Sequence, residues 1–184
     1  MYEAAVKDAL YTLISSNTAA LVAGITQQGS ARTIQLVKEL IVEIKHPYYL
    51  SISVANMRTW EDTGISVQIV QSGTMRAEYD VELELFEYAR DLVGGVHGYE
   101  VAGKDFDLLV ARLVKLLKEQ QSFTSSIHGT HTFELHRSAD ARLNRRIDVE
   151  ITDYPGAVTN GVPVFYAKLS LTLDEECVSL AGAA

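Results

Sequence analysis

The chain has a single cysteine, Cys177, among its 184 residues, so an intramolecular disulfide is excluded. A reducing compartment is therefore the simpler expectation. No window approaches the roughly 18 consecutive apolar residues of a membrane-spanning helix. The first residues include Glu3 and Asp8, where a secretory signal needs a basic start and an uninterrupted apolar run. These absences predict a soluble protein with no membrane partner.

The chain also lacks an excess of basic residues, since its formal net charge is −8. Affinity for nucleic acid comes largely from lysines and arginines that displace counterions from phosphates, so a general nucleic-acid binder is excluded. A protein lying beside DNA can instead use negative charge to repel it. With 47% hydrophobic and 22% charged residues, the length fits one domain over residues 1–184. We expect residues 175–184 to form a flexible tail.

Two segments place apolar residues at helical spacing. The first covers residues 5–14, and Ser15, Ser16 and Asn17 indicate its end. The second covers residues 104–121, and its apolar stripe consists of Phe106, Leu109, Val110, Leu113, Val114 and Leu117. The sequence thus predicts an amino-terminal helix and a second helix in the middle of the chain.

Further segments alternate apolar and polar residues, as strands with one buried face do. They are residues 48–57, 65–70, 79–89, 132–137, 145–151 and 163–173. The clearest is 79–89, which sets Tyr79, Val81, Leu83 and Leu85 against Asp80, Glu82 and Glu84. In residues 145–151 we expect Ile147, Val149 and Ile151 to face inward. The turn-forming residues 153–163 predict that the last two strands form an antiparallel hairpin with a long loop.

Residues 33–45 fit either a helix or a strand. Their high content of β-branched residues, followed by Pro47, favours a strand. The order of helix, strands, helix and strands predicts an α+β domain with a mainly antiparallel sheet, one face of which is covered by the two helices. The other sheet face is polar and meets either solvent or another copy of the chain.

Residues 98–105, GYEVAGKD, approach the pattern of a phosphate-binding loop. Asp105, however, stands where a hydroxyl would hold magnesium, and Glu100 adds negative charge beside an anion. The preceding strand also alternates, whereas a phosphate loop follows a continuously apolar strand. We therefore interpret this stretch as a glycine-rich turn into a helix capped by Asp105 and Asp107, with no nucleotide or other cofactor.

Three histidines, His128, His131 and His136, lie close together in HGTHTFELH. Their spacing matches no standard zinc site, and in a strand His131 and His136 point to opposite faces. We therefore expect ordinary solvent-facing or loop histidines and no bound metal.

The one basic cluster consists of Arg137, Arg142, Arg145 and Arg146. A nucleic-acid patch would carry interleaved aromatics, which this cluster lacks. A solvated loop, or salt bridges to an acidic neighbour such as the strand face of Asp80, Glu82 and Glu84, explains the cluster better. Arginine suits such pairing because guanidinium groups bind carboxylates bidentately. The candidate residues of a subunit interface are Asp80, Glu82, Glu84, Arg142, Arg145 and Arg146.

No catalytic constellation is evident, and we expect no enzymatic activity. Cys177 follows acidic residues that disfavour a thiolate, and the chain contains neither a GxSxG nor an HExxH motif.

The element order resembles the tail terminator, or tail completion, proteins of tailed bacteriophages. The features that carry this resemblance are the amino-terminal helix, the acidic strand RAEYDVELELFEYA, the helix KDFDLLVARLVKLL and the closing strand PVFYAKLSLTL. The likeness covers residues 2–173 and consists of length, element order and texture, because the family has no invariant ligand motif.

The resemblance implies a structural virion protein that forms a hexameric ring, caps the tail tube and joins it to the neck or head. The implied partners are other copies of the chain, the tail tube protein and a neck or connector protein, and DNA passes through without specific binding. The implied location is the virion, after assembly in the bacterial cytoplasm. The alternatives are a head-to-tail connector subunit, a small-ligand or metal-binding α+β domain, and an enzyme of unrecognised type.

Overall fold

The computed structural model describes residues 2–25, 34–37, 48–62, 74–88, 96–120, 122–137, 140, 145–159 and 162–177. Its elements are, in chain order, α1 (Tyr2–Leu21), β1 (Ile34–Val37), β2 (Tyr48–Asp62), β3 (Thr74–Tyr88), α2 (Val96–Glu119), β4 (Phe123–Ser125), β5 (His131–Leu135), β6 (Ile147–Thr159) and β7 (Val162–Cys177). The strand predicted at residues 65–70 lies outside the described residues, as does Arg142.

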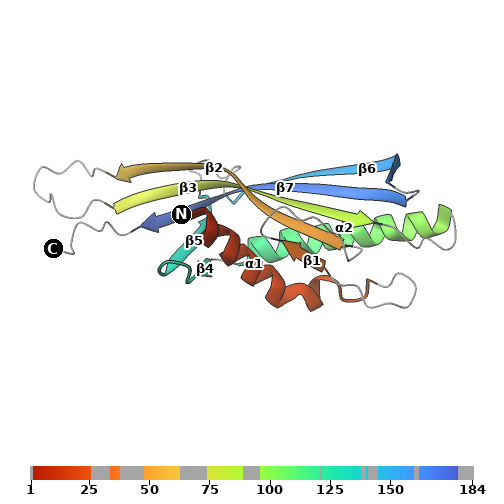
Figure 1. Ribbon diagram of the computed structural model, residues 1–184, viewed down its shortest axis with the longest axis horizontal. Helices are drawn as coiled ribbons and strands as arrows, with labels where there is room; N and C mark the ends of the chain where they lie inside the picture. Colours follow the sequence, from red (N-terminus) through yellow and green to blue (C-terminus); the bar gives the residue numbers. More distant parts are fainter. Residues whose placement is uncertain are drawn as a thin grey trace, which may run out of the picture.

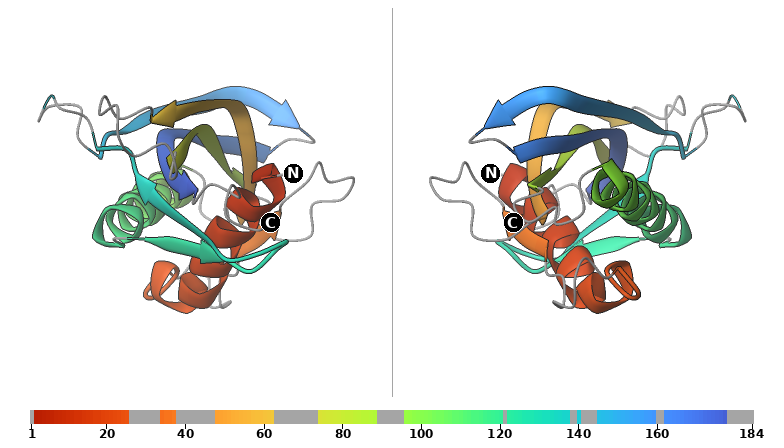
Figure 2. Two further views of the ribbon diagram at one scale, coloured as in Figure 1. Left: turned by 90° about the vertical axis from the view of Figure 1, so that its left-hand side faces the viewer. Right: turned by 90° about the vertical axis from the view of Figure 1, so that its right-hand side faces the viewer.

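All the strands belong to one sheet in the order β1-β2-β3-β7-β5-β4, and β6 also pairs with β7. β1 runs parallel to β2, and the other pairs are antiparallel. The long strands β2, β3 and β7 follow the long axis of the molecule (Figure 1). The sheet curls over α1 and α2, which lie beneath the same face (Figure 2). The predicted α+β class, with both helices on one sheet face, is confirmed.

The core forms because β3 and β7 alternate in step. Tyr79, Val81, Leu83 and Leu85 of β3 are buried, as are Leu169, Leu171 and Leu173 of β7. These side chains share a face because the two strands pair without a register shift, from Met75 opposite Cys177 to Tyr88 opposite Val164. The alternation predicted for residues 79–89 is therefore confirmed over residues 79–87, and it fixes which β3 side chains remain on the outer face.

The helices cover this apolar face with their own stripes. The buried residues of α1 are Ala5, Val6, Ala9, Leu10, Ile14 and Leu21, and those of α2 are Ala102, Phe106, Leu109, Val110, Leu113 and Leu117. Arg112 of α2 also donates hydrogen bonds to the carbonyl oxygens of Leu21 and Ala23, at 2.9 and 2.6 Å. A cation at these carbonyls complements the negative end of the α1 dipole and joins the two helices.

The amino-terminal helix is longer than predicted, because Ser15, Ser16 and Asn17 do not end it. Their side chains instead donate to helix carbonyls one turn back, those of Thr12 and Leu13. This back-bonding lets polar residues remain inside a helix. α1 therefore continues to Leu21, which is buried.

The interpretation of residues 98–105 as a turn and cap is wrong, because α2 begins at Val96 and includes all of them. Asp105 lies inside the helix rather than at its start. Gly103 faces β7, and a Cβ atom placed there would lie 3.4 Å from the ring of Phe165. Phe106 stacks on the same ring, with centroids 5.7 Å apart. Packing against Phe165 thus compensates for glycine in a helix.

The strand at residues 33–45 is confirmed for Ile34–Val37, and residues 38–47 lie outside the described part. The predicted carboxyl-terminal hairpin is present, but its long loop is not, since β6 extends to Thr159 and β7 begins at Val162. The flexible tail expected at residues 175–184 is wrong for residues 175–177, and residues 178–184 lie outside the described part. β7 continues to Cys177, and Glu175 is buried.

Val149 and Ile151 were predicted to face inward, but they are not buried. Both lie opposite buried residues of β7, Leu169 and Ala167, and therefore share the apolar face of the sheet. Yet their exposed fractions are 41% and 49%, whereas that of Ile147 is 9%. β6 therefore carries an uncovered apolar strip, consisting of Val149 and Ile151, along the border of the sheet.

Replacing Gly103 with alanine is expected to stabilise the protein by about 0.5–1 kcal/mol, the usual gain in a helix interior. The new methyl group would make an ordinary van der Waals contact with Phe165 at 3.4 Å. Urea denaturation measures the change in the free energy of unfolding. Gly103→Val is the matched control, and its larger side chain should destabilise the protein by displacing Phe165. A destabilised Gly103→Ala variant would contradict this packing.

Candidate functional site

The outer face of the sheet carries the polar residues that alternate with the core. On β3 these are Glu78, Asp80, Glu82 and Glu84, and on β7 they are Tyr166, Lys168, Ser170, Thr172 and Asp174. Each carboxylate of β3 lies directly opposite one of these β7 residues in the strand register, as in Glu82 opposite Ser170 and Glu84 opposite Lys168. We call this surface the polar face.

The carboxylates of β3 have partners within the chain. Asp80 accepts hydrogen bonds from Arg58 of β2 at 3.0 Å and from the hydroxyl of Thr172 at 3.0 Å. Glu82 pairs with Lys168 at 2.7 Å, and Glu84 accepts from the hydroxyl of Tyr166 at 2.9 Å. Intramolecular contacts thus already provide much of the charge compensation that we expected at a subunit interface.

Asp80 and Glu82 share an open hollow of about 280 Å³ with Arg146, at the junction of β3, β7 and the start of β6. The structure therefore brings part of the arginine cluster to the acidic strand, although Arg146 pairs with Asp148 at 2.6 Å. Arg145 adopts a positive φ of 52°, and its amide donates to the carbonyl of His136 at 2.9 Å. Glu84 does not line this hollow.

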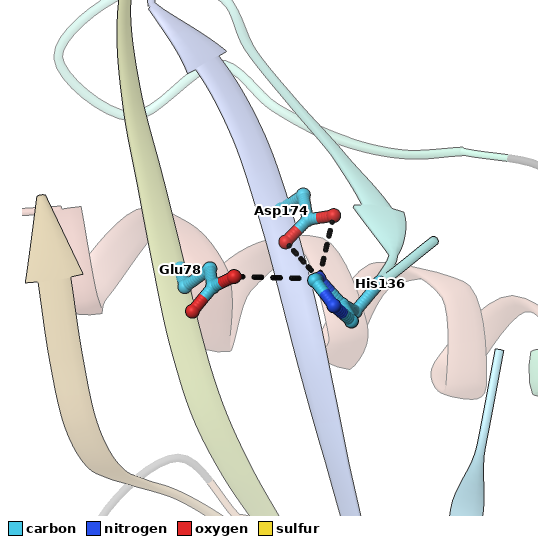
Figure 3. Close-up of side chains that lie close together, drawn as sticks. All are labelled: Glu78, His136 and Asp174. Carbon is cyan, nitrogen blue, oxygen red and sulfur yellow. Dashed lines mark hydrogen bonds and ion pairs between the residues drawn. The ribbon is translucent and has the colours of Figure 1, made fainter. Parts of the chain in front are cut away.

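His136, just after β5, lies between two carboxylates of the polar face (Figure 3). Its Nδ1 atom is 2.9 and 3.0 Å from the two carboxylate oxygens of Asp174 and 3.4 Å from Oε1 of Glu78. The backbone amide of His136 donates to the carbonyl of Thr172 at 2.9 Å, which fixes the residue beside β7. One imidazole nitrogen and oxygens from two carboxylates thus converge from three parts of the sheet.

His131 and His136 point to opposite faces of the sheet, as predicted, and they have different roles. Its Nδ1 atom is 2.6 Å from Oε1 of Glu175, a carboxylate that is only 4% exposed. Tyr79 donates to the other oxygen of Glu175 at 2.6 Å. Because Asp174 and Glu175 are consecutive on β7, one faces outward to His136 and the other inward to His131. His131 is therefore a partly buried structural residue, with 11% of its side chain exposed, and not the solvent-facing histidine that we expected.

Glu78, Asp174 and the partners of the acidic strand were not predicted from the sequence. Glu78 is in phase with Asp80, and Asp174 is in phase with Lys168, so strand alternation alone places each on the polar face. The missing information was the register between β3 and β7, which pairs Glu78 with Asp174 although 96 positions separate them in the chain.

Comparison with known proteins gives no assignment: no protein-family model matches the chain, and no curated protein is similar to it. Among the described residues, no helix is long and apolar enough to cross a membrane.

The ammonium group of Lys168 is expected to titrate above its ordinary value. Its hydrogen bond to Glu82 raises the pKa above 10.5, as do the charges of Glu82, Glu84 and Glu150, against a smaller opposing effect of desolvation. Its stabilising contribution is thus complete below pH 10.5 and is lost as the pH rises through the elevated pKa. NMR titration of the lysine side chain should show this, and Glu82→Gln should lower the pKa. Glu134→Gln, which alters a carboxylate paired with Arg137, should leave it unchanged.

Glu175→Ala is expected to destabilise the protein by about 3 kcal/mol or more, because it removes the buried carboxylate that both Tyr79 and His131 contact. Tyr79→Phe removes one of these hydrogen bonds and should cost about 1.5–3 kcal/mol. Chemical denaturation of both variants gives the comparison. A smaller loss for Glu175→Ala than for Tyr79→Phe would show that the carboxylate does not organise this network.

Proposed function

We propose that this protein is a structural assembly protein of a bacteriophage virion, a tail terminator whose copies form a hexameric ring that caps the tail tube and joins it to the neck. The observation that carries the proposal is the uncovered apolar strip of Val149 and Ile151 on β6. Exposed apolar side chains that lie next to one another are one mark of a surface that another protein covers, whereas singly scattered ones are ordinary.

The edges of the sheet support an assembly of identical copies. Within the described ranges, β6 has β7 on one side and no strand on the other. On the opposite side of the sheet, β1 pairs with β2 only at residues 48–51, so residues 52–62 of β2 have no described strand beside their outer edge. Open strand edges readily pair with another chain. Two different edges on one protomer allow heterologous contacts, which close into a ring if the rotation permits.

The net negative charge of the chain fits this role because it repels DNA. A net charge of −8 disfavours adhesion of DNA to a channel through which it has to slide. Asp80, Glu82 and Glu84 have intramolecular partners, so the β6 strip is a better-supported subunit contact than the acidic strand and the arginine cluster. The same features suit a neck or connector subunit, and the place of the ring in the virion distinguishes the two.

A ring should be detectable by size-exclusion chromatography with light scattering and by native mass spectrometry. We expect a hexamer for the wild type and smaller species for Val149→Lys/Ile151→Lys. Burying the remaining exposed half of two aliphatic side chains contributes about 1.5–3 kcal/mol in total, so each contact should weaken about tenfold or more.

Leu108→Lys is the matched control for this experiment. Leu108 is 41% exposed but lies on α2, so its replacement should leave the ring intact. A wild type that is monomeric at every concentration would contradict the proposal, as would equal effects of the β6 and α2 variants. If the ring forms, its ability to stop the growth of purified tail tubes separates a terminator from a connector.

A further inference from the structure

We propose that Glu78, His136 and Asp174 form a binding site for a divalent transition metal of the zinc class, independently of the proposed role in assembly. The ligand atoms of these three residues lie within 4.8 Å of one another. They come from β3, from β7 and from the segment just after β5, so the fold and not local sequence brings them together.

A row of carboxylates across the sheet favours a bound cation. Glu78, Asp174 and Glu134 lie directly opposite one another across β3, β7 and β5. Like charges in direct cross-strand positions destabilise a sheet unless cations compensate them. Arg58 contacts Glu78 at 3.4 Å from one side and Arg137 contacts Glu134 at 2.8 Å from the other. Arg58 also serves Asp80, so the centre of the row, at Asp174, remains rich in negative charge.

The type and spacing of the donor atoms suit zinc. An imidazole nitrogen with carboxylate oxygens is a donor set that Zn²⁺ accepts, whereas Mg²⁺ and Ca²⁺ prefer oxygen alone. Ligand atoms around a tetrahedral zinc ion lie about 3.4 Å apart, given bonds of about 2.0–2.1 Å. Nδ1 of His136 lies 3.4 Å from Glu78 and 2.9 Å from Asp174. The ligand oxygens of Glu78 and Asp174 lie within 4.8 Å of each other, so the side chains would have to close by up to about 1.4 Å toward a common point to hold the ion.

Neighbouring side chains and backbone groups hold the three ligands in their orientation. Arg58 contacts Oε2 of Glu78 and leaves Oε1 directed toward His136. The amide of Arg137 lies 3.4 Å from Oδ2 of Asp174, and the backbone of His136 is bonded on both sides, to Thr172 and Arg145. Such outer contacts fix the orientation of metal ligands. His136 and Asp174 are each 36% exposed, so solvent can reach the ion and complete its coordination.

Zinc titration of the metal-depleted full chain by isothermal calorimetry tests the site. We expect the wild type to bind zinc, and we expect His136→Ala and Asp174→Asn to bind it more than about tenfold more weakly, since even outer-shell changes have effects of that size. Zinc should also raise the thermal midpoint of the wild type and not that of His136→Ala, because a ligand stabilises only the state that binds it.

His128→Asn is the control for the loss of a histidine outside the proposed site. His128 is exposed and has a φ of 58°, which asparagine tolerates. It should bind zinc as the wild type does. Asp174→Asn preserves the shape of the side chain and keeps the test valid if His136→Ala fails to fold. A wild type that binds no zinc would overturn the proposal. So would equal zinc affinity in the wild type, His136→Ala and Asp174→Asn, which would place the metal elsewhere.

Discussion

The antiparallel pairing of β7 with β3 is the constraint on which the rest of the structure depends. It runs without a register shift over both strands, and β7 also pairs with β5 and β6 along its other edge. Because strand side chains alternate, this register decides which residues enter the core and which reach the polar face. Asp174 and Glu175 illustrate the result, since adjacent carboxylates face opposite environments. A slip by one residue would bury Asp174 and expose the leucines of β7.

The same register accounts for the electrostatics of the polar face. It places a column of carboxylates on β3 beside polar residues of β7, so cations from neighbouring elements are needed to compensate them. Lys168 does this from β7 and Arg58 from β2. His136 approaches from beyond β5, where the row of Glu78 and Asp174 is most acidic. The surface is therefore determined by cross-strand geometry, and the metal proposal follows from the row with the least compensation.

Local sequence was sufficient for features that depend on periodicity. Strand alternation predicted the buried face of residues 79–89, and helical spacing predicted the stripe around Phe106. It failed where tertiary contacts decide the outcome. Gly103 lies in a helix that packs on Phe165 through Phe106, although glycine favours turns. Val149 is exposed although it lies opposite the buried Leu169. The pairing of Glu78 with Asp174 likewise depends on strand register, which no single segment specifies. The candidate site was therefore less predictable than the fold.

The apolar strip and the histidine cluster share one stretch of backbone. His136 is anchored to β7 through Thr172, and Arg145 donates to its carbonyl two residues before β6 begins. Arg146 and Asp148 then line the hollow that also contains His136. An ion held at His136 would restrain the start of β6, and a neighbouring protomer covering Val149 and Ile151 would restrain the same strand farther along. Both proposed contacts would therefore act on the same strand, β6.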